Sequence, residues 1–260
     1  MAVLQDRAAV VAAHSTTEPL ISFIIPVLND RMSLDILLPQ LQGYREKGHE
    51  LLLVDGGSND GSVSSATGLV DRILMTGPGR ARQMNLGADN AKHDILQFVH
   101  ADSRLPDDLD SIILKSMQNP ERLWGRFDVS LDENGFAYVM IAFMMNLRTR
   151  LSGVATGDQG IFVRKTVFHE TGGFKDIPLM EDVAISKILR KKSWPVCLKA
   201  KIITSARRWK QKGVLRTILM MWYLRLAYFM GADPVGLAAI YYPQETSDGD
   251  SDRRNKADES

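Results

Sequence analysis

Apolar runs alternate with amphipathic segments along the first half of the chain. The runs are short, continuous and rich in leucine, isoleucine, valine and phenylalanine, which is typical of strands buried on both faces of a parallel sheet. We predict strands at residues 21–28, 50–54, 72–76 and 95–99. Helical spacing, capping residues and a glycine-rich turn predict helices at residues 34–47, 62–69 and 106–117 and within 77–91.

The second half of the chain continues this alternation less regularly. We predict strands at residues 124–129, 161–164 and 196–203. We predict helices at residues 136–150, 165–172 and 180–191. This order requires crossover connections, so the sequence predicts an α/β fold with a mostly parallel central sheet flanked by helices. Because no repeat or flexible linker divides the chain, we expect one domain at 20–212 and a helical extension at 213–243.

The two ends of the chain depart from this pattern. The apolar stretch within residues 1–19 is short, and Asp6 stands where a signal peptide carries only positive charge. A loose leader or short helix is therefore favoured there over a targeting peptide. Residues 244–260 are almost all polar or charged, which predicts a disordered tail.

The composition narrows the classes of partner. Apolar residues make up 45% and charged residues 24% of the chain, as in an ordinary globular protein. The formal net charge of +1 predicts no nucleic-acid binding, and an acidic partner would need a local basic cluster. Cys197 is the single cysteine, which excludes an intrachain disulfide and is compatible with a cytoplasmic location.

Three aspartates stand next to predicted strands. Asp55 follows the run ELLLV, Asp102 closes ILQFVHAD, and Asp158 precedes the strand at 161–164. Ligands of open parallel sheets bind beyond the carboxyl ends of the strands, so these residues are candidates for a site. Each of them alone could equally form a turn or cap a helix.

The segment DGGSNDGS, which begins at Asp55, carries the most information. Gly56 and Gly57 allow a sharp turn and a close approach of the backbone to a ligand, while Asp55 can accept hydrogen bonds from a nucleobase or ribose. Residues 58–62 also suit the cap of the next helix. The segment matches neither the G-x-G-x-x-G of a dinucleotide fold nor the G-K-[ST] of a P-loop, which excludes both.

Five motifs in order resemble the family 2 glycosyltransferases of the GT-A fold: ISFIIPVLND, LLLVDGGSNDGS, GRARQMNLGA, FVHAD and the pair Glu181-Asp182. The matching region spans residues 20–210, and the order is more specific than any single motif. The chain is similar to a small subgroup with HAD in place of D-x-D. The resemblance implies inverting, hexosyl-type transfer from a nucleotide diphosphate sugar to an acceptor hydroxyl.

The resemblance also implies a pocket for the nucleotide, in which Asp55 would contact the base. The pocket would be lined by Pro26, Asn29 and Gly56. Arg80 and Arg82 lie in the glycine-rich turn that opens a helix, where anions bind and where arginine suits a phosphate. We expect them to contact phosphate or sugar, with a solvated helix face as the alternative.

The segment that corresponds to D-x-D reads His100-Ala101-Asp102. The resemblance implies that Asp102 binds the divalent metal, Mn²⁺ or Mg²⁺, that bridges the diphosphate. One carboxylate, phosphate oxygens and water suffice for such a cation. His100 is either a further ligand, which would suit Mn²⁺ better, or a hydrogen-bonding residue at the strand end.

The pair Glu181-Asp182 opens a predicted helix, where acidic residues also complement the helix dipole. The resemblance implies that Asp182 is the general base that deprotonates the acceptor hydroxyl, with Glu181 beside the substrate. Asp158 lies in a glycine-rich segment and either shapes the acceptor or sugar pocket or only forms a turn.

The segment TSARRW at residues 204–209 is similar to the Arg-Trp end of the Q-x-x-R-W motif of processive members. Ser205 stands where that motif has glutamine, which weighs against polymer synthesis. Arg207 or Arg208 could hold the leaving diphosphate. Trp209 could stack on the acceptor sugar, or it could only make a cation–π contact or anchor the core.

Residues 214–230 form a strongly apolar segment interrupted by Arg216 and Arg225. A seventeen-residue helix is only about 25 Å long, and Arg225 would be costly inside a bilayer. Packing on the catalytic domain, a homodimer interface and peripheral contact with a membrane surface remain as alternatives.

Two other functions compete with glycosyl transfer. A nucleotidyltransferase that makes sugar nucleotides has a related sheet, but its glycine-rich, lysine-containing segment after the first strand is replaced here by LNDR at residues 28–31. A non-catalytic sugar-, nucleotide- or lipid-binding module would explain the replacement of the first metal aspartate. The presence of Asp102 and Asp182 argues against it.

Overall fold

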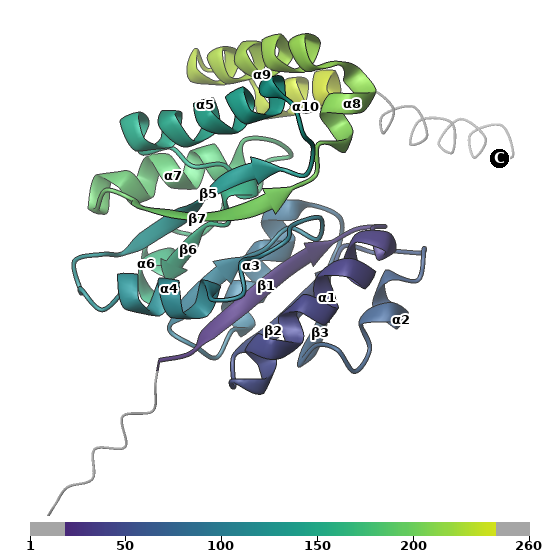
Figure 1. Ribbon diagram of the computed structural model, residues 1–260, viewed down its shortest axis with the longest axis vertical. Helices are drawn as coiled ribbons and strands as arrows, with labels where there is room; N and C mark the ends of the chain where they lie inside the picture. Colours follow the sequence, from purple (N-terminus) through teal and green to yellow (C-terminus); the bar gives the residue numbers. More distant parts are fainter. Residues whose placement is uncertain (1–18, 243–260) are drawn as a thin grey trace, which may run out of the picture.

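The computed structural model describes residues 19–242 and is built around a seven-stranded sheet (Figure 1). The strand order is β3-β2-β1-β4-β6-β5-β7. The strands are β1 (Ile21–Val27), β2 (Glu50–Asp55), β3 (Arg72–Met75), β4 (Ile95–Phe98), β5 (Trp124–Leu131), β6 (Phe162–Arg164) and β7 (Val196–Thr204). Only β6 runs antiparallel to its neighbours among these strands, which confirms the predicted α/β class with a mostly parallel sheet.

Helices flank the sheet on both faces. They are α1 (Arg31–Glu46), α2 (Ser62–Ala66), α3 (Arg80–Asn90), α4 (Leu109–Ser116), α5 (Phe136–Ser152), α6 (Lys165–Glu170), α7 (Glu181–Lys192), α8 (Arg207–Lys212), α9 (Val214–Phe229) and α10 (Pro234–Tyr241), with the short 3₁₀ helix η1 (Gly157–Gln159). The predicted elements are all present, and their ends shift by a few residues. The leader expected over residues 1–18 and the tail expected over residues 244–260 lie outside the described residues.

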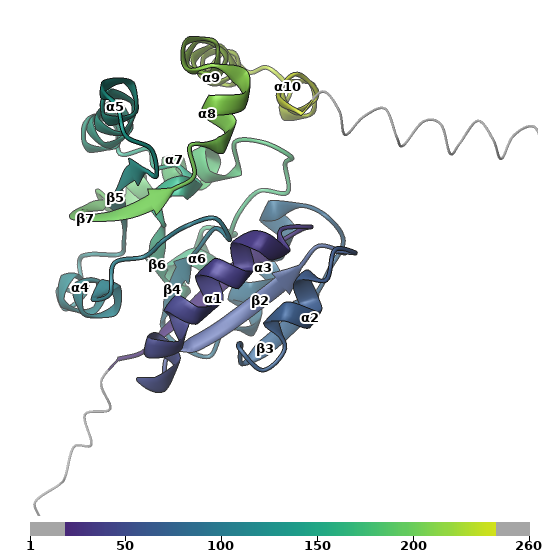
Figure 2. The same cartoon turned by 45° about the vertical axis from the view of Figure 1, so that its right-hand side comes forward.

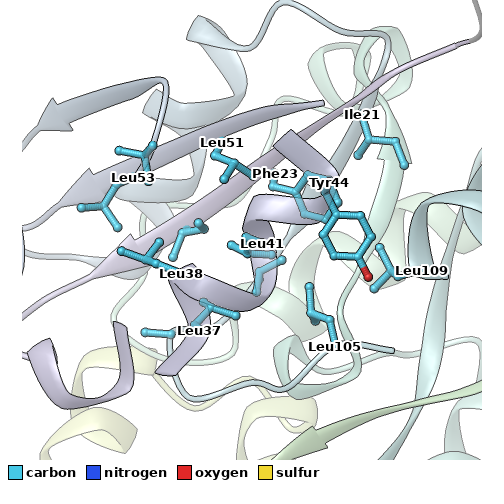
Figure 3. Packing of buried hydrophobic residues seen from close by; sticks show 14 of the residues in the cluster. Ile21, Phe23, Leu37, Leu38, Leu41, Tyr44, Leu51, Leu53, Leu105 and Leu109 are labelled. Carbon is cyan, nitrogen blue, oxygen red and sulfur yellow. The ribbon is translucent and has the colours of Figure 1, made fainter. Parts of the chain in front are cut away.

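Strand β1 shows why the sheet forms where it does, because every one of its residues is buried. Ile21, Phe23 and Ile25 point to one face, where the leucines of α1 and α4 pack against them (Figure 3). Ile24 points to the other face and belongs to a second core with α3, α6 and α7. The period of two along a strand therefore supplies both cores from one continuous apolar run.

The second half of the sheet is fixed by polar side chains as well as by packing. Asn146 on α5 is buried, accepts a hydrogen bond from the backbone of Val129 at 2.9 Å and donates one to its carbonyl at 3.0 Å. Arg126, fully buried on β5, pairs with Asp128, which also binds Arg150 on α5. These bonds hold α5 on β5 in one register.

The C-terminal helices α9 and α10 pack against the start of α7. Leu224 of α9 and Leu237 and Tyr241 of α10 form a third core with Met180 and Val183, at the start of α7. Figures 1 and 2 show α5, α9 and α10 together at one end, beyond β5 and β7. No helix within residues 19–242 combines the length and apolar character needed to span a bilayer.

Candidate active site

The candidate residues gather beyond the carboxyl ends of the parallel strands β1, β2 and β4. The register places Val27, the last residue of β1, opposite Asp55, the last residue of β2. The chain that leaves β4 carries His100 and Asp102 to the same edge of the sheet. This edge is where open α/β sheets bind their ligands.

Asp55 is fully buried and folds the turn after β2 around its own carboxylate. Its Oδ2 accepts hydrogen bonds from the backbone N–H groups of Gly57 at 2.8 Å and Ser58 at 2.9 Å. Its Oδ1 is buried as well, yet has no hydrogen-bond partner among the described residues. A buried acceptor without a donor is costly, so this oxygen is available for a ligand N–H or O–H group.

Two amide side chains brace the turn around Gly56. Asn29 has a positive φ of 50°, donates its backbone N–H to Ser58 and accepts a bond from the backbone of Asn59. Gln83 on α3 donates to the carbonyl oxygens of Val27 at 2.6 Å and Val54 at 2.9 Å and lies directly against Gly56. Pro26 is buried within β1, one residue before this end of the strand.

The acidic centre joins the end of β4, η1 and the start of α7. Asp182 Oδ2 accepts a hydrogen bond from the backbone N–H of Gly157 at 2.8 Å, and its Oδ1 accepts one from Val183 at 2.6 Å. His100 Nδ1 lies 3.3 Å from Asp158 Oδ1. A Cβ at position 157 would stand 2.5 Å from His100 Nε2, so only glycine lets the ring pack here.

Glu181 and Arg80 meet behind this centre. Glu181 is 5% exposed, and its Oε1 lies 3.8 Å from Arg80 Nη1. Burial raises the pKa of Glu181, the charge of Asp182 raises it further, and Arg80 partly opposes both. Desolvation works against the charge of Arg80, yet acidic neighbours, Glu181 foremost, raise the pKa of this arginine.

Asp102 lies at the mouth of the site with its side chain exposed. Burial still raises the pKa of Asp102 and Asp158 raises it further, while interactions with His100 and Arg80 lower it. Within residues 19–242, no group of three or more His, Cys, Asp or Glu side chains would hold a metal ion alone. The donor set therefore fits a cation that is shared with phosphate oxygens of a substrate.

Helices α5 and α9 form a further wall of the site, and neither of their arginines there was predicted as a site residue. Arg148 on α5 and Arg225 on α9 both feel the charges of Asp182 and Asp158. Burial raises the pKa of Tyr228, one turn further along α9, and the charge of Asp182 adds to this effect. The third core, which packs α9 against Met180 and Val183, brings these groups to the acids.

Other predicted residues lie apart from the acidic centre. Arg82 is exposed and bonds Asp176 at 2.7 Å, so its guanidinium points to the loop before α7. Arg207 is exposed on α8 and Trp209 is partly buried there, while the side chain of Arg208 lies outside the described part of the structure. No described hydrogen bond or ion pair links Arg207 or Trp209 to Asp102, Asp158 or Asp182.

The site also contains residues that sequence reasoning missed. Gln83 was visible within GRARQMNLG, but only the fold shows that its amide bridges two strand ends. Arg225 interrupts an apolar segment, and Arg148 follows one on α5. A positively charged residue inside an apolar segment was the signal that could have identified these arginines, because burying an unpaired charge costs free energy.

The fold and the family comparison together define a glycosyltransferase of the GT-A type. The family model described as "Glycosyl transferase family 2" matches residues 22–175, which is more than half of the chain. The chain therefore belongs to glycosyl transferase family 2. This membership favours glycosyl transfer over the nucleotidyltransferase alternative.

Two curated relatives are similar over part of their length. The chain is 24% identical over 163 residues to the undecaprenyl-phosphate 4-deoxy-4-formamido-L-arabinose transferase of Aeromonas hydrophila, covering 58% of this chain and 50% of that protein. It is 29% identical over 97 residues to an uncharacterized glycosyltransferase of Haemophilus influenzae, covering 35% and 39%. The chain thus matches half or less of these relatives.

Two solved structures show the same fold. The mannosyltransferase PcManGT of Pyrobaculum calidifontis, in complex with GDP-Man and Mn²⁺, has a TM-score of 0.60 at 18% identity, over 82% of this chain and 62% of that one. TarS 1-349 of S. aureus, in complex with UDP-GlcNAc, has a TM-score of 0.58 at 15% identity, over 72% and 58%.

The burial of Glu181 gives a prediction for the pH dependence of stability. Its pKa is higher in the folded than in the unfolded chain, so stability is lost as the pH rises through the folded pKa. Glu181→Gln cannot ionise and escapes this loss. We expect the unfolding temperature of the variant, relative to wild type, to rise between pH 4.5 and pH 8, as measured by calorimetry.

The matched control is Glu121→Gln, which removes the same charge from an exposed loop. Its unfolding temperature relative to wild type should change little over this range. An equal response of the two variants to pH would show that Glu181 is not held in a desolvated site.

Proposed function

We propose that the protein transfers a hexose from a nucleotide diphosphate sugar to an acceptor hydroxyl with inversion at the anomeric carbon. One observation carries the proposal: Asp55 presents a buried acceptor oxygen without a donor at the edge of the sheet where Asp102 and Asp182 also lie. In this arrangement Asp55 would bind the nucleoside, Asp102 the diphosphate through a metal, and Asp182 the acceptor. The donors in the two similar structures, GDP-Man and UDP-GlcNAc, support the hexosyl class.

The donor nucleoside would lie against the turn after β2. Asp55 Oδ1 accepts a hydrogen bond from the base or ribose. Gly56 has no side chain, so the nucleoside can approach the backbone closely. Pro26 and Asn29 line the same pocket. Arg80 lies at the start of α3 on the way to the acidic centre, where its guanidinium contacts the diphosphate or the sugar.

Asp102 would hold the divalent metal, Mn²⁺ or Mg²⁺, together with oxygens of the diphosphate. A metal bound there neutralises the charge that develops on the leaving diphosphate. His100 has Nδ1 on Asp158 and its ring packed over Gly157, which supports a role in positioning rather than in ligation. In this role His100 holds Asp158 at the edge of the sugar pocket.

Asp182 is the general base of the proposed reaction. Its two backbone hydrogen bonds fix the carboxylate and leave lone pairs for the acceptor hydroxyl. The carboxylate takes the hydroxyl proton, the acceptor oxygen bonds to the anomeric carbon, and the bond from that carbon to the diphosphate oxygen breaks. Glu181 lies beside this carboxylate on its buried side and pairs with Arg80.

Thermal unfolding with UDP-, GDP- and dTDP-sugars, with and without Mn²⁺ or Mg²⁺, tests the donor site. A ligand at a hundred times its Kd adds about 2.7 kcal/mol to the free energy of unfolding. We expect one nucleotide class to stabilise the wild type in a metal-dependent manner. Asp102→Ala should lose the metal-dependent part of the shift.

Asp55→Asn is the sharper variant for the base-binding oxygen. The amide oxygen can still accept from Gly57 and Ser58, but an NH₂ group replaces the free acceptor. Affinity for the nucleotide should fall by about ten-fold or more, since an unmatched buried donor costs about 1–3 kcal/mol. No shift with any nucleotide in the wild type would refute the donor site and leave the non-catalytic module as the better interpretation.

The end of the molecule formed by α5, α9 and α10 exposes many large apolar side chains, which we call the apolar end. They are Phe136, Val139, Met140, Phe143, Met144, Leu151, Leu215, Leu219, Trp222, Tyr223, Leu226, Phe229, Met230, Val235 and Ile240. Exposed apolar patches of this extent mark interaction surfaces. Figure 2 shows these three helices on the same side of the sheet.

We infer that the apolar end rests on an anionic membrane surface. The stretch from residue 204 to residue 232 contains six Lys and Arg residues and no Asp or Glu. Arg225 faces the acids and Lys210 pairs with Glu133, but exposed cations such as Arg216 on α9 complement anionic headgroups. The name of the Aeromonas relative contains undecaprenyl phosphate, which is a lipid. A membrane-bound chain would meet a lipid acceptor at the end where Asp182 lies under α9.

Flotation with phosphatidylglycerol vesicles tests this docking. The double variant Leu219→Ser, Trp222→Ser should bind at least about ten-fold more weakly, since each buried apolar side chain contributes about 1.5–3 kcal/mol. The control, Met32→Ser with Met75→Ser, removes exposed apolar side chains from α1 and β3 and should bind as wild type. A dimeric wild type that the first variant makes monomeric, with no vesicle binding by either, would assign the surface to homodimerisation instead.

A further inference from the structure

Two arginines on the wall formed by α5 and α9 have no part in the reaction as derived so far. Arg148 and Arg225 approach the acids from this wall, whereas Arg80 approaches them from α3. Asp158 and Asp182 interact electrostatically with all three arginines. The acidic centre therefore lies between two separate sources of positive charge.

Arg148 is poorly satisfied by the protein itself. Its Nε and Nη1 atoms are fully buried and have no hydrogen-bond partner among the described residues. Its Nη2 reaches Thr156 Oγ1 only at 3.4 Å, which is a weak contact. Buried guanidinium groups normally satisfy their donors with carboxylates or carbonyls, so the N–H groups of these two nitrogens point to a missing acceptor.

Neither guanidinium has a close counter-ion in the part of the chain that the structure describes. No carboxylate oxygen lies within 4.0 Å of Arg148 or Arg225 there. Both oxygens of Asp182 already accept backbone hydrogen bonds, and Asp158 lies against His100. The charges of the nearby acids thus stabilise the two guanidinium groups electrostatically, but the acids do not accept hydrogen bonds from their N–H groups.

This arrangement opposes folding. Burial foremost, and then the like charge of Arg225, lower the pKa of Arg148 to about 9, which still leaves it charged at neutral pH. Burial also lowers the pKa of Arg225. Two neighbouring, partly buried cations without close counter-ions destabilise the folded chain, and such strain is typical of a site made for a ligand.

We propose that Arg148 and Arg225 together bind a phosphate group of the acceptor, beside the hydroxyl that Asp182 deprotonates. The planar guanidinium and its unpaired N–H groups match phosphate oxygens in pairs. The inference rests on the proposed transferase function and adds the substrate class, a phosphorylated acceptor. The phosphate belongs either to a soluble compound or to a lipid headgroup, since the chemistry of recognition is shared.

The donor diphosphate is the less suitable occupant of this pair. Arg80 is the arginine among the groups that act most strongly on Asp102, so a metal held by Asp102 would put the diphosphate nearer to Arg80 on α3. Arg148 and Arg225 lie on the α5 and α9 side, next to Tyr228 and the apolar end. An acceptor that enters from the apolar end would pass α9, which carries Arg225, on its way to Asp182.

The test measures thermal unfolding with the nucleoside diphosphate and Mg²⁺ already at saturation. Glycerol 3-phosphate is then added as the soluble probe, and vesicles that contain phosphatidic acid are the membrane probe. We expect at least one probe to raise the unfolding temperature further in wild type. Arg148→Met and Arg225→Met should lose this second shift and retain the first shift from the nucleotide.

Two further readouts separate binding from a merely structural role. Without ligand, Arg148→Met should unfold at the same temperature as wild type or higher, because a poorly paired buried cation is removed. Arg190→Met, which removes an exposed guanidinium from α7, should keep both shifts. A response to glycerol 3-phosphate identifies a soluble acceptor, and a response to vesicles alone identifies a lipid.

Three results would overturn the proposal. They are a second shift that both arginine variants retain, a nucleotide shift in wild type with no response to either probe, and a loss of the nucleotide shift itself in the variants. The last result would assign the two arginines to the donor diphosphate. Failure of the proposed transferase function is distinct from all three, because the wild type would then show no nucleotide shift.

Discussion

The hydrogen bond from the backbone of Gly157 to Asp182 is the interaction on which the site depends. At 2.8 Å it ties the start of α7 to η1, while His100 and Asp158 tie η1 to the end of β4. Segments far apart in the chain thereby place a carboxylate at the edge of a sheet whose other strands hold the nucleotide turn. Glycine is required at position 157, because a side chain there would displace His100.

The electrostatics of the site follow from the same arrangement. Acidic groups crowd around the place where sugar transfer would occur, and burial raises the pKa of Glu181 in particular. Cations from α3 on one side and from α5 and α9 on the other compensate this charge only in part. Three of the buried polar atoms that have no hydrogen-bond partner among the described residues, Asp55 Oδ1 and two nitrogens of Arg148, lie where we propose that the two substrates bind. These unpaired atoms lower the stability of the folded chain, and a bound ligand would supply the hydrogen bonds that they lack.

Local patterns in the sequence were enough to predict the strands of the sheet and the α/β class of the fold. Apolar runs such as Ile21–Val27 are buried as expected, and Asp55 and Asp102 stand at strand ends as their motifs indicated. Long-range partners could not be predicted in this way. Arg82 is bonded to Asp176, and α9 packs on Met180. Both contacts join residues that are far apart in the chain, and no local pattern encodes them. The antiparallel course of β6 has the same origin.

The most direct test of the account is the effect of Asp182→Asn on turnover of the bound donor. The rate of nucleoside diphosphate release should fall by about 10²–10⁴-fold, since a general base contributes that much, while the thermal shift from donor binding persists. Asp107→Asn, an exposed carboxylate before α4, should react at the wild-type rate. Release of nucleoside diphosphate by Asp182→Asn at a rate close to that of wild type would contradict the assignment of the base, and with it the proposed mechanism.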